Sequence, residues 1–392
     1  MFRLSTAQLA QSYDRKLQME SVLPDPLEDF KGNFDIETGK VPNGHTMYVD
    51  MKGQRQRTLL VSRPISGGIQ GRTAQIGNEV DHDALEMLCY ANDFSNAILT
   101  ETYGVDANEK SFYNFLDKVQ PQLSLWHGEK RGRYKREALL ERYSNNLTVA
   151  PISKTARWNE NIYVVNAGTN QPTYSTVNAE YEEEIGDAIT TAGITSAATL
   201  SVAVLNRLRY WAQVTKKLEP MDNGRYILLV PSRQALPLID PSSSTSIAGV
   251  FKDSTVAEAA MNSYNCYLGT WGKIFDIFED PRAPVADLTG SSGTYGLAAA
   301  YKDPGTTDAR ASTSGTVCDV GFILGKGALI EAEYEPLHFK DEDQNYKKIK
   351  GVGAFHGAGW TRRVYDASAS PTTTYVQQSS GIFLCAASGV TL

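Results

Sequence analysis

The spacing of hydrophobic positions first becomes regular near residue 47, where it has the period of a strand. Met47, Val49 and Met51 alternate with Tyr and Asp, which is expected when one face of a strand is buried. A second apolar run and the glycine-rich stretch 66–71 follow. The whole span 45–92 has too few large apolar residues to fold alone, so we expect a long protruding loop made of strands.

The clearest helical pattern begins after Asp106. This residue is a good N-cap, and Glu109 three positions later completes a capping-box-like pair. Apolar side chains then recur at helical spacing at Phe112, Phe115, Leu116 and Val119. Pro121 should kink or restart the helix. We therefore expect one long kinked helix or two abutting helices.

Helical and strand patterns alternate in the second half of the chain. A helix is expected from about 200 to 217, and the continuous apolar run at 225–231 predicts a buried strand. A short helix should follow at 232–240. Regular structure returns at 317–323 and at 349–365. This mixture predicts an α+β fold.

The first 44 residues read as an extended arm after a short helical start, because proline and glycine interrupt any regular element from Pro24 onward. Such an arm has no core of its own. It lies either on the body or on a neighbouring subunit, and a floppy terminus is the alternative.

Composition limits the classes of function. The length of 392 residues suggests two or three lobes, and the 41% hydrophobic content is enough for a substantial core. The net charge of −7 argues against a dedicated nucleic-acid binder, which needs a basic face. No long apolar run follows Met1, so we expect neither a signal peptide nor a membrane span.

Cysteine and histidine spacings do not favour a metal site. The cysteines are widely separated, without a CxxC pair, and free thiols in a reducing compartment are the simplest interpretation. They are Cys89, Cys266, Cys318 and Cys385. No two histidines lie three or four residues apart.

A search for catalytic motifs also fails. Residues 67–71 lack the spacing of a dinucleotide fingerprint, and 325–327 lack the flanks of a phosphate loop. Residues 341–343 lack the turn glycine and closing glutamate of a calcium loop. We therefore expect no enzyme, cofactor or metal, with a dispersed active site as the remaining enzymatic alternative.

A basic run lies in the charged continuation of the long helix. It comprises Lys130, Arg131, Arg133, Lys135 and Arg136. We interpret it mainly as the exposed face of the helix. Contacts with nucleic acid, or with acidic surfaces of a neighbouring subunit, are the alternatives.

The order of elements, from arm to strand loop to long helix to mixed lobe, resembles the Hong Kong 97-type coat proteins of tailed phages. Three stretches carry the resemblance, at 225–239, 268–281 and 321–365. Residues 341–353 and the run 67–79 are most similar to the coat-protein family typified by the podophage N-four. The resemblance covers about 45–365, and 145–200 match it less well.

The resemblance implies an α+β, Hong Kong 97-type capsid fold with an N-terminal arm, an E-loop, a P-domain and an A-domain. The implied regions are 1–44 as the arm, 45–92 as the E-loop, 93–217 as the P-domain with its spine helix and a candidate insertion at 145–200, 218–335 as the A-domain, 336–366 as the return to the P-domain, and 367–392 as a C-terminal tail.

The same resemblance implies a major capsid protein that self-assembles into hexamers and pentamers of an icosahedral head shell around phage DNA. It implies assembly in the host cytoplasm, with a scaffolding protein, a portal and candidate decoration proteins as partners. Packaged double-stranded DNA would be contacted non-specifically, and no membrane is involved. The expected inter-subunit contacts of the E-loop are Lys52, Arg55, Arg57, Gly67, Gly68 and Gly71. A non-viral, encapsulin-like compartment protein of the same fold is the alternative.

Overall fold

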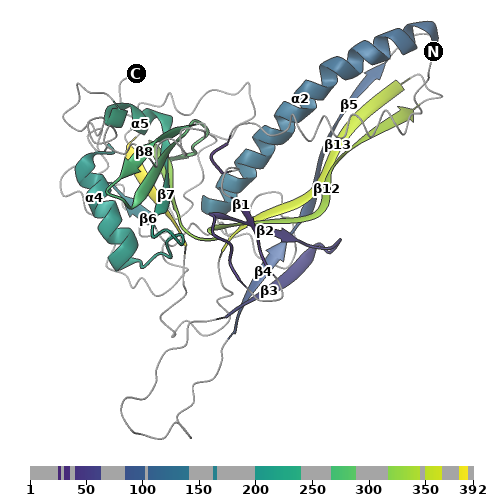
Figure 1. Ribbon diagram of the computed structural model, residues 1–392. Helices are drawn as coiled ribbons and strands as arrows, with labels where there is room; N and C mark the ends of the chain where they lie inside the picture. Colours follow the sequence, from purple (N-terminus) through teal and green to yellow (C-terminus); the bar gives the residue numbers. More distant parts are fainter. Residues whose placement is uncertain are drawn as a thin grey trace, which may run out of the picture.

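The chain forms a rounded lobe joined to a long extended part (Figure 1). The computed structural model describes residues 25–27, 31–35, 40–62, 84–101, 105–140, 162–165, 199–239, 266–287, 317–344, 349–363 and 379–386. The regions 63–83 and 145–161, which carry Gly67, Gly68, Gly71 and part of the candidate insertion, lie outside these residues.

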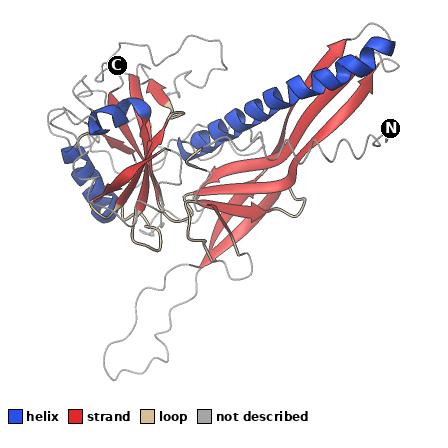
Figure 2. Ribbon diagram, turned by 45° about the horizontal axis from the view of Figure 1, so that its top comes forward, coloured by secondary structure: helices blue, strands red, loops and turns tan. Residues whose placement is uncertain are grey.

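The extended part is a five-stranded sheet with one long helix lying along it (Figures 1 and 2). The strand order is β1 (Lys31–Asn33), β2 (Thr46–Asp50), β12 (Leu329–Gln344), β13 (Ile349–Arg362) and β5 (Asn92–Glu101). Strands β12 and β13 are antiparallel and pair from Leu329 opposite Arg362 to Gln344 opposite Ile349. Strand β2 runs parallel to β12, so distant parts of the chain share this sheet.

Helix α2 (Val105–Leu140) is a single helix of 36 residues. Of the two expectations, one long helix is confirmed and a restart at Pro121 is wrong. Pro121 is exposed, and its missing N–H costs the helix one backbone hydrogen bond. On the opposite side, Val119 and Leu123 pack against the sheet in a small apolar cluster with Val352, and this contact holds the helix together across the proline.

The lobe is built on a seven-stranded sheet with short helices outside it (Figure 2). The strand order is β6 (Ile162–Val164), β14 (Ser380–Ala386), β11 (Val317–Leu324), β7 (Tyr226–Pro231), β9 (Phe275–Asp280) and β8 (Tyr267–Trp271), with β10 (Val285–Asp287) also paired to β11. The helices are α4 (Val202–Tyr210), its continuation η1 (Trp211–Thr215), which has π-helical geometry, and α5 (Ser232–Ile239). Every residue of β7 is buried, as its continuous apolar run predicts.

A third unit is the two-stranded ribbon of β3 (Gln56–Ser62) and β4 (Ala84–Tyr90), which pair antiparallel from Gln56 opposite Tyr90 to Ser62 opposite Ala84. The strand alternation near residue 47 is confirmed, because Met47, Val49 and Met51 are all fully buried.

The sheets do not follow the domain boundaries expected from the sequence. Strand β2 belongs to the five-stranded sheet although it falls within 45–92, and the boundary at 335 falls inside β12. Strand β14, from the expected tail, lies between β6 and β11 in the lobe. Backbone pairing with partners far along the chain decides these memberships, and local hydrophobic spacing does not reveal such partners.

Candidate functional site

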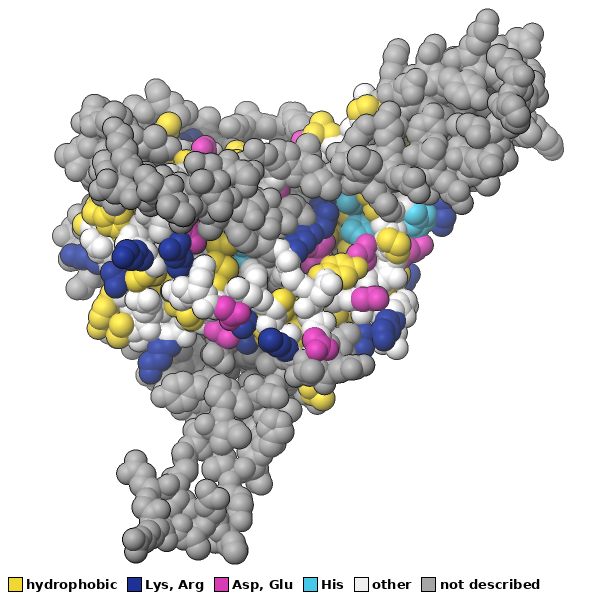
Figure 3. Space-filling view, viewed as in Figure 1, with side chains coloured by type: hydrophobic (Ala, Val, Ile, Leu, Met, Phe, Trp, Pro, Cys, Tyr) yellow, Lys and Arg dark blue, Asp and Glu magenta, His cyan; other side chains and the backbone are white. Residues whose placement is uncertain are grey.

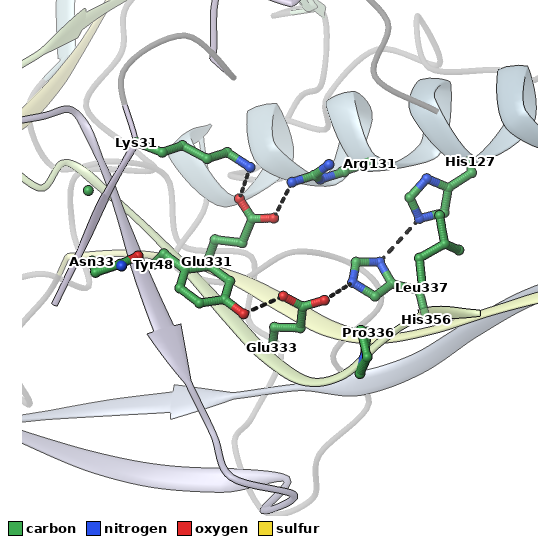
Figure 4. Close-up of a pocket in the computed structure, with 11 residues that line it drawn as sticks. Lys31, Asn33, Tyr48, His127, Arg131, Glu331, Glu333, Pro336, Leu337 and His356 are labelled. Atoms are coloured by element: carbon green, nitrogen blue, oxygen red, sulfur yellow. Dashed lines mark hydrogen bonds and ion pairs between the residues drawn. The ribbon is translucent and has the colours of Figure 1, made fainter. Parts of the chain in front are cut away.

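A polar pocket lies where α2 crosses the five-stranded sheet. It has a volume of about 520 Å³ and opens between β1, β2, β12, β13 and the helix. Histidine, basic and acidic side chains gather at this position on the face shown in Figure 3. Figure 4 shows the side chains that line the pocket, with two chains of contacts that meet the helix.

Glu331 on β12 is the centre of the first chain of contacts, although only 2% of its surface is exposed. Its carboxylate lies 2.6 Å from Nη2 of Arg131 and 2.9 Å from Nζ of Lys31. Nζ of Lys135 lies 3.5 Å away. We call these four residues the Glu331 cluster. Burial alone would raise the pKa of Glu331, but the three cations outweigh it and hold the pKa well below its usual value.

The second chain of contacts, which we call the histidine relay, consists of Tyr48, Glu333, His356 and His127 (Figure 4). The hydroxyl of Tyr48 donates to Oε2 of Glu333, and Oε1 of the same carboxylate lies 3.2 Å from Nε2 of His356. Nδ1 of His356 lies 3.1 Å from Nε2 of His127 on α2. Phe94 on β5 stacks on His127 with ring centroids 5.1 Å apart. The relay therefore connects β2, β12 and β13 to the helix.

The environment sets the charges of the relay. Burial tends to raise the pKa of Glu333, but hydrogen bonds from His356 and Tyr48 lower it overall, so the group is a carboxylate at neutral pH. Burial and the neighbouring His356 and Arg131 lower the pKa of His127 well below its usual value. His127 is therefore neutral at pH 7.

Arg136 forms a third polar centre close to the end of α2 that meets the lobe. Its guanidinium donates to both oxygens of Asp280 on β9, at 2.8 and 2.6 Å, and to both oxygens of Asp25, at 3.0 Å each. It also donates to the carbonyl of Gly132 at 2.9 Å. Arg136 and Asp280 are fully buried, and Asp25 is 5% exposed. We call Asp25, Arg136 and Asp280 the arginine hub.

The hub joins three parts of the molecule: the N-terminal segment, the long helix and the lobe. Burial would raise the pKa of Asp25, but the charge and hydrogen bonds of Arg136 lower it below the usual range. A side chain at Gly132 would displace the hub, because its Cβ would lie 2.8 Å from Oδ2 of Asp25 and 3.1 Å from Nη1 of Arg136. The sequence therefore places a glycine where the N-terminal segment meets the helix.

These contacts correct the main interpretation of the basic run as an exposed helix face. Lys135 and Arg136 are fully buried, and Arg131 is 16% exposed and paired with Glu331. Arg133 is 29% exposed and pairs with Glu137, whereas Lys130 is partly exposed. The physical reason is that buried carboxylates on β12, on β9 and in the N-terminal segment neutralise the cations that face inward.

The E-loop residues that the structure describes lie at the base of the β3–β4 ribbon. Lys52 is in a turn with φ 49°, and its N–H donates to Asp50 at 2.8 Å. Arg55 is paired with Asp93 on β5 at 2.6 Å, and both side chains are more than half exposed. Arg57 donates to the carbonyl of Asp50 at 2.8 Å. None of the three is brought into the pocket.

Sequence reasoning missed both the relay and the hub. His127 and His356 are 229 positions apart, so spacing rules for metal sites cannot connect them. One local signal was present. His127, Arg131 and Lys135 follow Val119 and Leu123 at intervals of four, so they continue the buried helix face.

Two functional classes receive no support from the described side chains. Among them, no group of three or more His, Cys, Asp or Glu is placed to hold a metal ion. No helix in the ranges given above has the length and apolar content to cross a membrane.

Comparisons of sequence find no matching family model and no curated protein with significant similarity. Comparisons of structure do find matches. The capsid of Cyanophage Pam1 aligns with a TM-score of 0.59 and 13% identity, covering 99% of each chain. The capsid of Ralstonia phage GP4 gives 0.58 and 12%, covering 92% of this chain and 91% of that one. The capsid of Helicobacter pylori bacteriophage KHP30 gives 0.58 and 14%, covering 93% and 91%.

These similarities extend over nearly the whole of each chain. They confirm the predicted α+β class and the Hong Kong 97-type arrangement of long helix, long strands and separate lobe. The closer relation to the coat proteins typified by the podophage N-four stays a prediction. This chain has the fold of phage capsid proteins.

Proposed function

We propose that the chain is the major capsid protein of a tailed bacteriophage, which assembles into hexamers and pentamers of an icosahedral head shell around double-stranded DNA. The observation that carries this proposal is the match to capsid chains over 92–99% of this chain's length. A fold alone does not specify function, so the shape of the molecule must also suit a shell.

The extended parts of the molecule suit assembly. A shell lattice needs repeated contacts between different surfaces of identical subunits, and obligate interfaces commonly bury about 2,000–5,000 Å². The β3–β4 ribbon is only two strands wide, which is marginal for an isolated unit in water. We propose that it is the stem of the E-loop and that the loop lies over a neighbouring subunit, with Lys52, Arg55 and Arg57 at its base.

The remaining assignments follow the same proposal. Helix α2 with the five-stranded sheet serves as the P-domain, and the seven-stranded lobe serves as the A-domain around the five- and six-fold axes. A scaffolding protein and a portal are the expected assembly partners, with decoration proteins as additional candidates. The shell is located in the virion head after assembly in the host cytoplasm. The encapsulin-like alternative is not favoured, since the reported neighbours are phage capsids.

Negative-stain electron microscopy of the purified chain, alone and with its scaffolding protein, tests the proposal. The wild-type protein should form closed shells or their hexameric and pentameric units. A variant in which an Asn-Gly turn replaces residues 63–83 should fold and remain soluble but form no shells. The design is sterically reasonable because Ser62 and Ala84 face each other in the β3–β4 ladder, and Asn-Gly closes two-residue hairpins.

A matched control substitutes an exposed position away from the ribbon, Leu236→Ala on α5, where the side chain is 46% exposed. Circular dichroism should give the same helical signal for all three proteins. Normal shells from the loop-closed variant would contradict the E-loop assignment. A wild-type chain that stays monomeric with its scaffolding protein would contradict the proposed function itself.

A further inference from the structure

The hydrogen bonds of the histidine relay fix the positions of its protons when both rings are neutral. The carboxylate of Glu333 can only accept, so Nε2 of His356 carries a hydrogen. Nδ1 of a neutral His356 then accepts from Nε2–H of His127, at 3.1 Å. The remaining nitrogen of His127, Nδ1, is buried and has no hydrogen-bond partner. The N–H donors of both histidines thus point along the relay toward Glu333.

The relay can accept one additional proton without breaking. As a cation, His356 donates from both nitrogens, to Glu333 and to His127, if the single hydrogen of His127 moves to Nδ1. A second added proton has no such arrangement. Nδ1 of His356 and Nε2 of His127 would then both carry hydrogens, and two imidazolium rings would face each other across 3.1 Å.

The charged groups around the two rings either repel a second added proton or stabilise it only in part. The groups that face it are Arg131 and Lys135 on α2, Glu331 and Glu333 on β12, Lys31 on β1 and Tyr48 on β2. The carboxylate of Glu331 is already shared by three cations. Glu333 is the only carboxylate of the described part of the pocket that contacts a ring directly.

The relay is also placed where it can control the helix. His127 lies between two permanent attachments of α2 to the rest of the molecule, the apolar contact at Leu123 and the arginine hub at Arg136. Opening of the His127–His356 contact would remove a polar tie between helix and strand without removing either attachment. The rings are packed with Phe94 and Trp360, so separation of the rings also disturbs this aromatic cluster.

We propose that the histidine relay is a proton-sensitive latch, which holds α2 against β13 at neutral pH and releases it when both histidines are protonated. The two rings act as one unit, because the first proton changes the tautomer of the partner and the second breaks the bond between them. The latch is a property of the subunit and does not depend on shell formation.

The pH range follows from the direction of the shift at His127. Its pKa in the folded chain lies below the unfolded value of about 6.5, so the unfolded chain binds the proton first. Stability is therefore complete above about pH 6.5 and falls as the pH drops below that value. Where the unfolded chain binds one proton more than the folded chain, the folding equilibrium constant falls about tenfold for each pH unit of acidification. Glu331 and Glu333 have lowered pKa values in the folded chain, so their contributions to stability are lost only below about pH 4.5, the pKa of glutamate in the unfolded chain.

Urea unfolding of the full-length chain at pH 7, 6 and 5 tests the latch, with wild type compared to His127→Gln. The amide of Gln can donate to Nδ1 of His356 but cannot titrate in this range. Between pH 7 and pH 6 the folding equilibrium constant of wild type should fall about threefold more than that of the variant, and between pH 6 and pH 5 almost tenfold more. The matched control is His338→Gln, which replaces a partly exposed histidine of the same sheet and leaves every contact of the relay in place.

A local measurement separates the latch from general acid sensitivity. Between pH 7 and pH 5, hydrogen exchange corrected for its intrinsic pH dependence should increase in the part of α2 around His127, between the apolar contact at Leu123 and the ion pair of Arg131 with Glu331. It should not increase in β7 of the lobe, and His127→Gln should abolish the increase. Parallel stability profiles of wild type and His127→Gln would overturn the proposal. If the variant fails to fold, the ring resonances of His127 in wild-type NMR spectra decide: an ordinary titration of His127 near pH 6.5 would also overturn the proposal.

Discussion

The arginine hub predicts a large and specific cost for removing one cation. In Arg136→Met, five hydrogen bonds from the guanidinium disappear. Asp25 and Asp280 are then left buried side by side with no cation between them. Breaking a buried, hydrogen-bonded ion pair by removing one partner costs about 3–5 kcal/mol. We expect the free energy of unfolding to fall by at least that amount at pH 7.

The assay is urea unfolding followed by circular dichroism, with two comparisons on the same helix and hub. Arg133→Met removes a single i,i+4 pair in which Arg133 is 29% exposed and Glu137 is buried, so it should cost more than an exposed helix pair at about 0.3–0.5 kcal/mol but less than Arg136→Met. Adding Asp25→Asn and Asp280→Asn to Arg136→Met should recover much of the loss, because the uncompensated charges are gone.

The pH dependence gives an independent check on the same variant. The folded pKa of Asp25 lies below its unfolded value of 3.8 because of Arg136, so its contribution is present above about pH 4 and lost as the pH falls toward the folded value. The difference in the free energy of unfolding between wild type and Arg136→Met should therefore become smaller below pH 4. If Arg136→Met costs no more than Arg133→Met, or if the added asparagines recover nothing, the view of the hub as a charge-balanced tie is wrong.

Three further predictions concern single positions. Burial raises the pKa of Cys89 to about 12, so a thiol reagent at pH 8 should label the half-buried Cys266 first and the three buried cysteines only after unfolding, as peptide mapping will show. Gly359→Ala should lower the free energy of unfolding by about 1–3 kcal/mol or more, measured with urea, because its Cβ would lie 1.9 Å from the carbonyl oxygen of Tyr90. Pro121→Ala should raise the melting temperature, since it restores one hydrogen bond at an exposed position inside α2 and a proline there costs about 3 kcal/mol relative to alanine; an unchanged or lower value would count against this account.

The sequence predicts local elements well where one physical signal dominates. The buried run at 225–231 and the helix after Asp106 both correspond to observed elements. The restart expected at Pro121 does not occur, because the contacts of Val119 and Leu123 against the sheet hold the helix on both sides of the proline.

The candidate site was harder to predict, because its partners come from opposite ends of the chain. Asp25 and Arg136 are 111 positions apart, and Arg136 and Asp280 are 144 apart. A run of basic residues on a helix does not predict which of them will pair with buried carboxylates. The four-residue interval from His127 to Lys135 indicates a common helix face, but only the position of β12 decides that this face turns inward.

The attachment of α2 near one end gives the molecule a mechanical property. Its 36 residues extend about 54 Å at 1.5 Å per residue, and the arginine hub ties the helix to the lobe close to its C-terminal end (Figure 1). Because the helix is also fastened to the five-stranded sheet, helix and sheet would turn together, and a rotation of about 5° at the hub would move the opposite end by about 5 Å over that length. Rotations at the hub that are too small to disturb the packing of the lobe would therefore produce displacements of several ångströms, about 5 Å for 5°, at the far end of the helix.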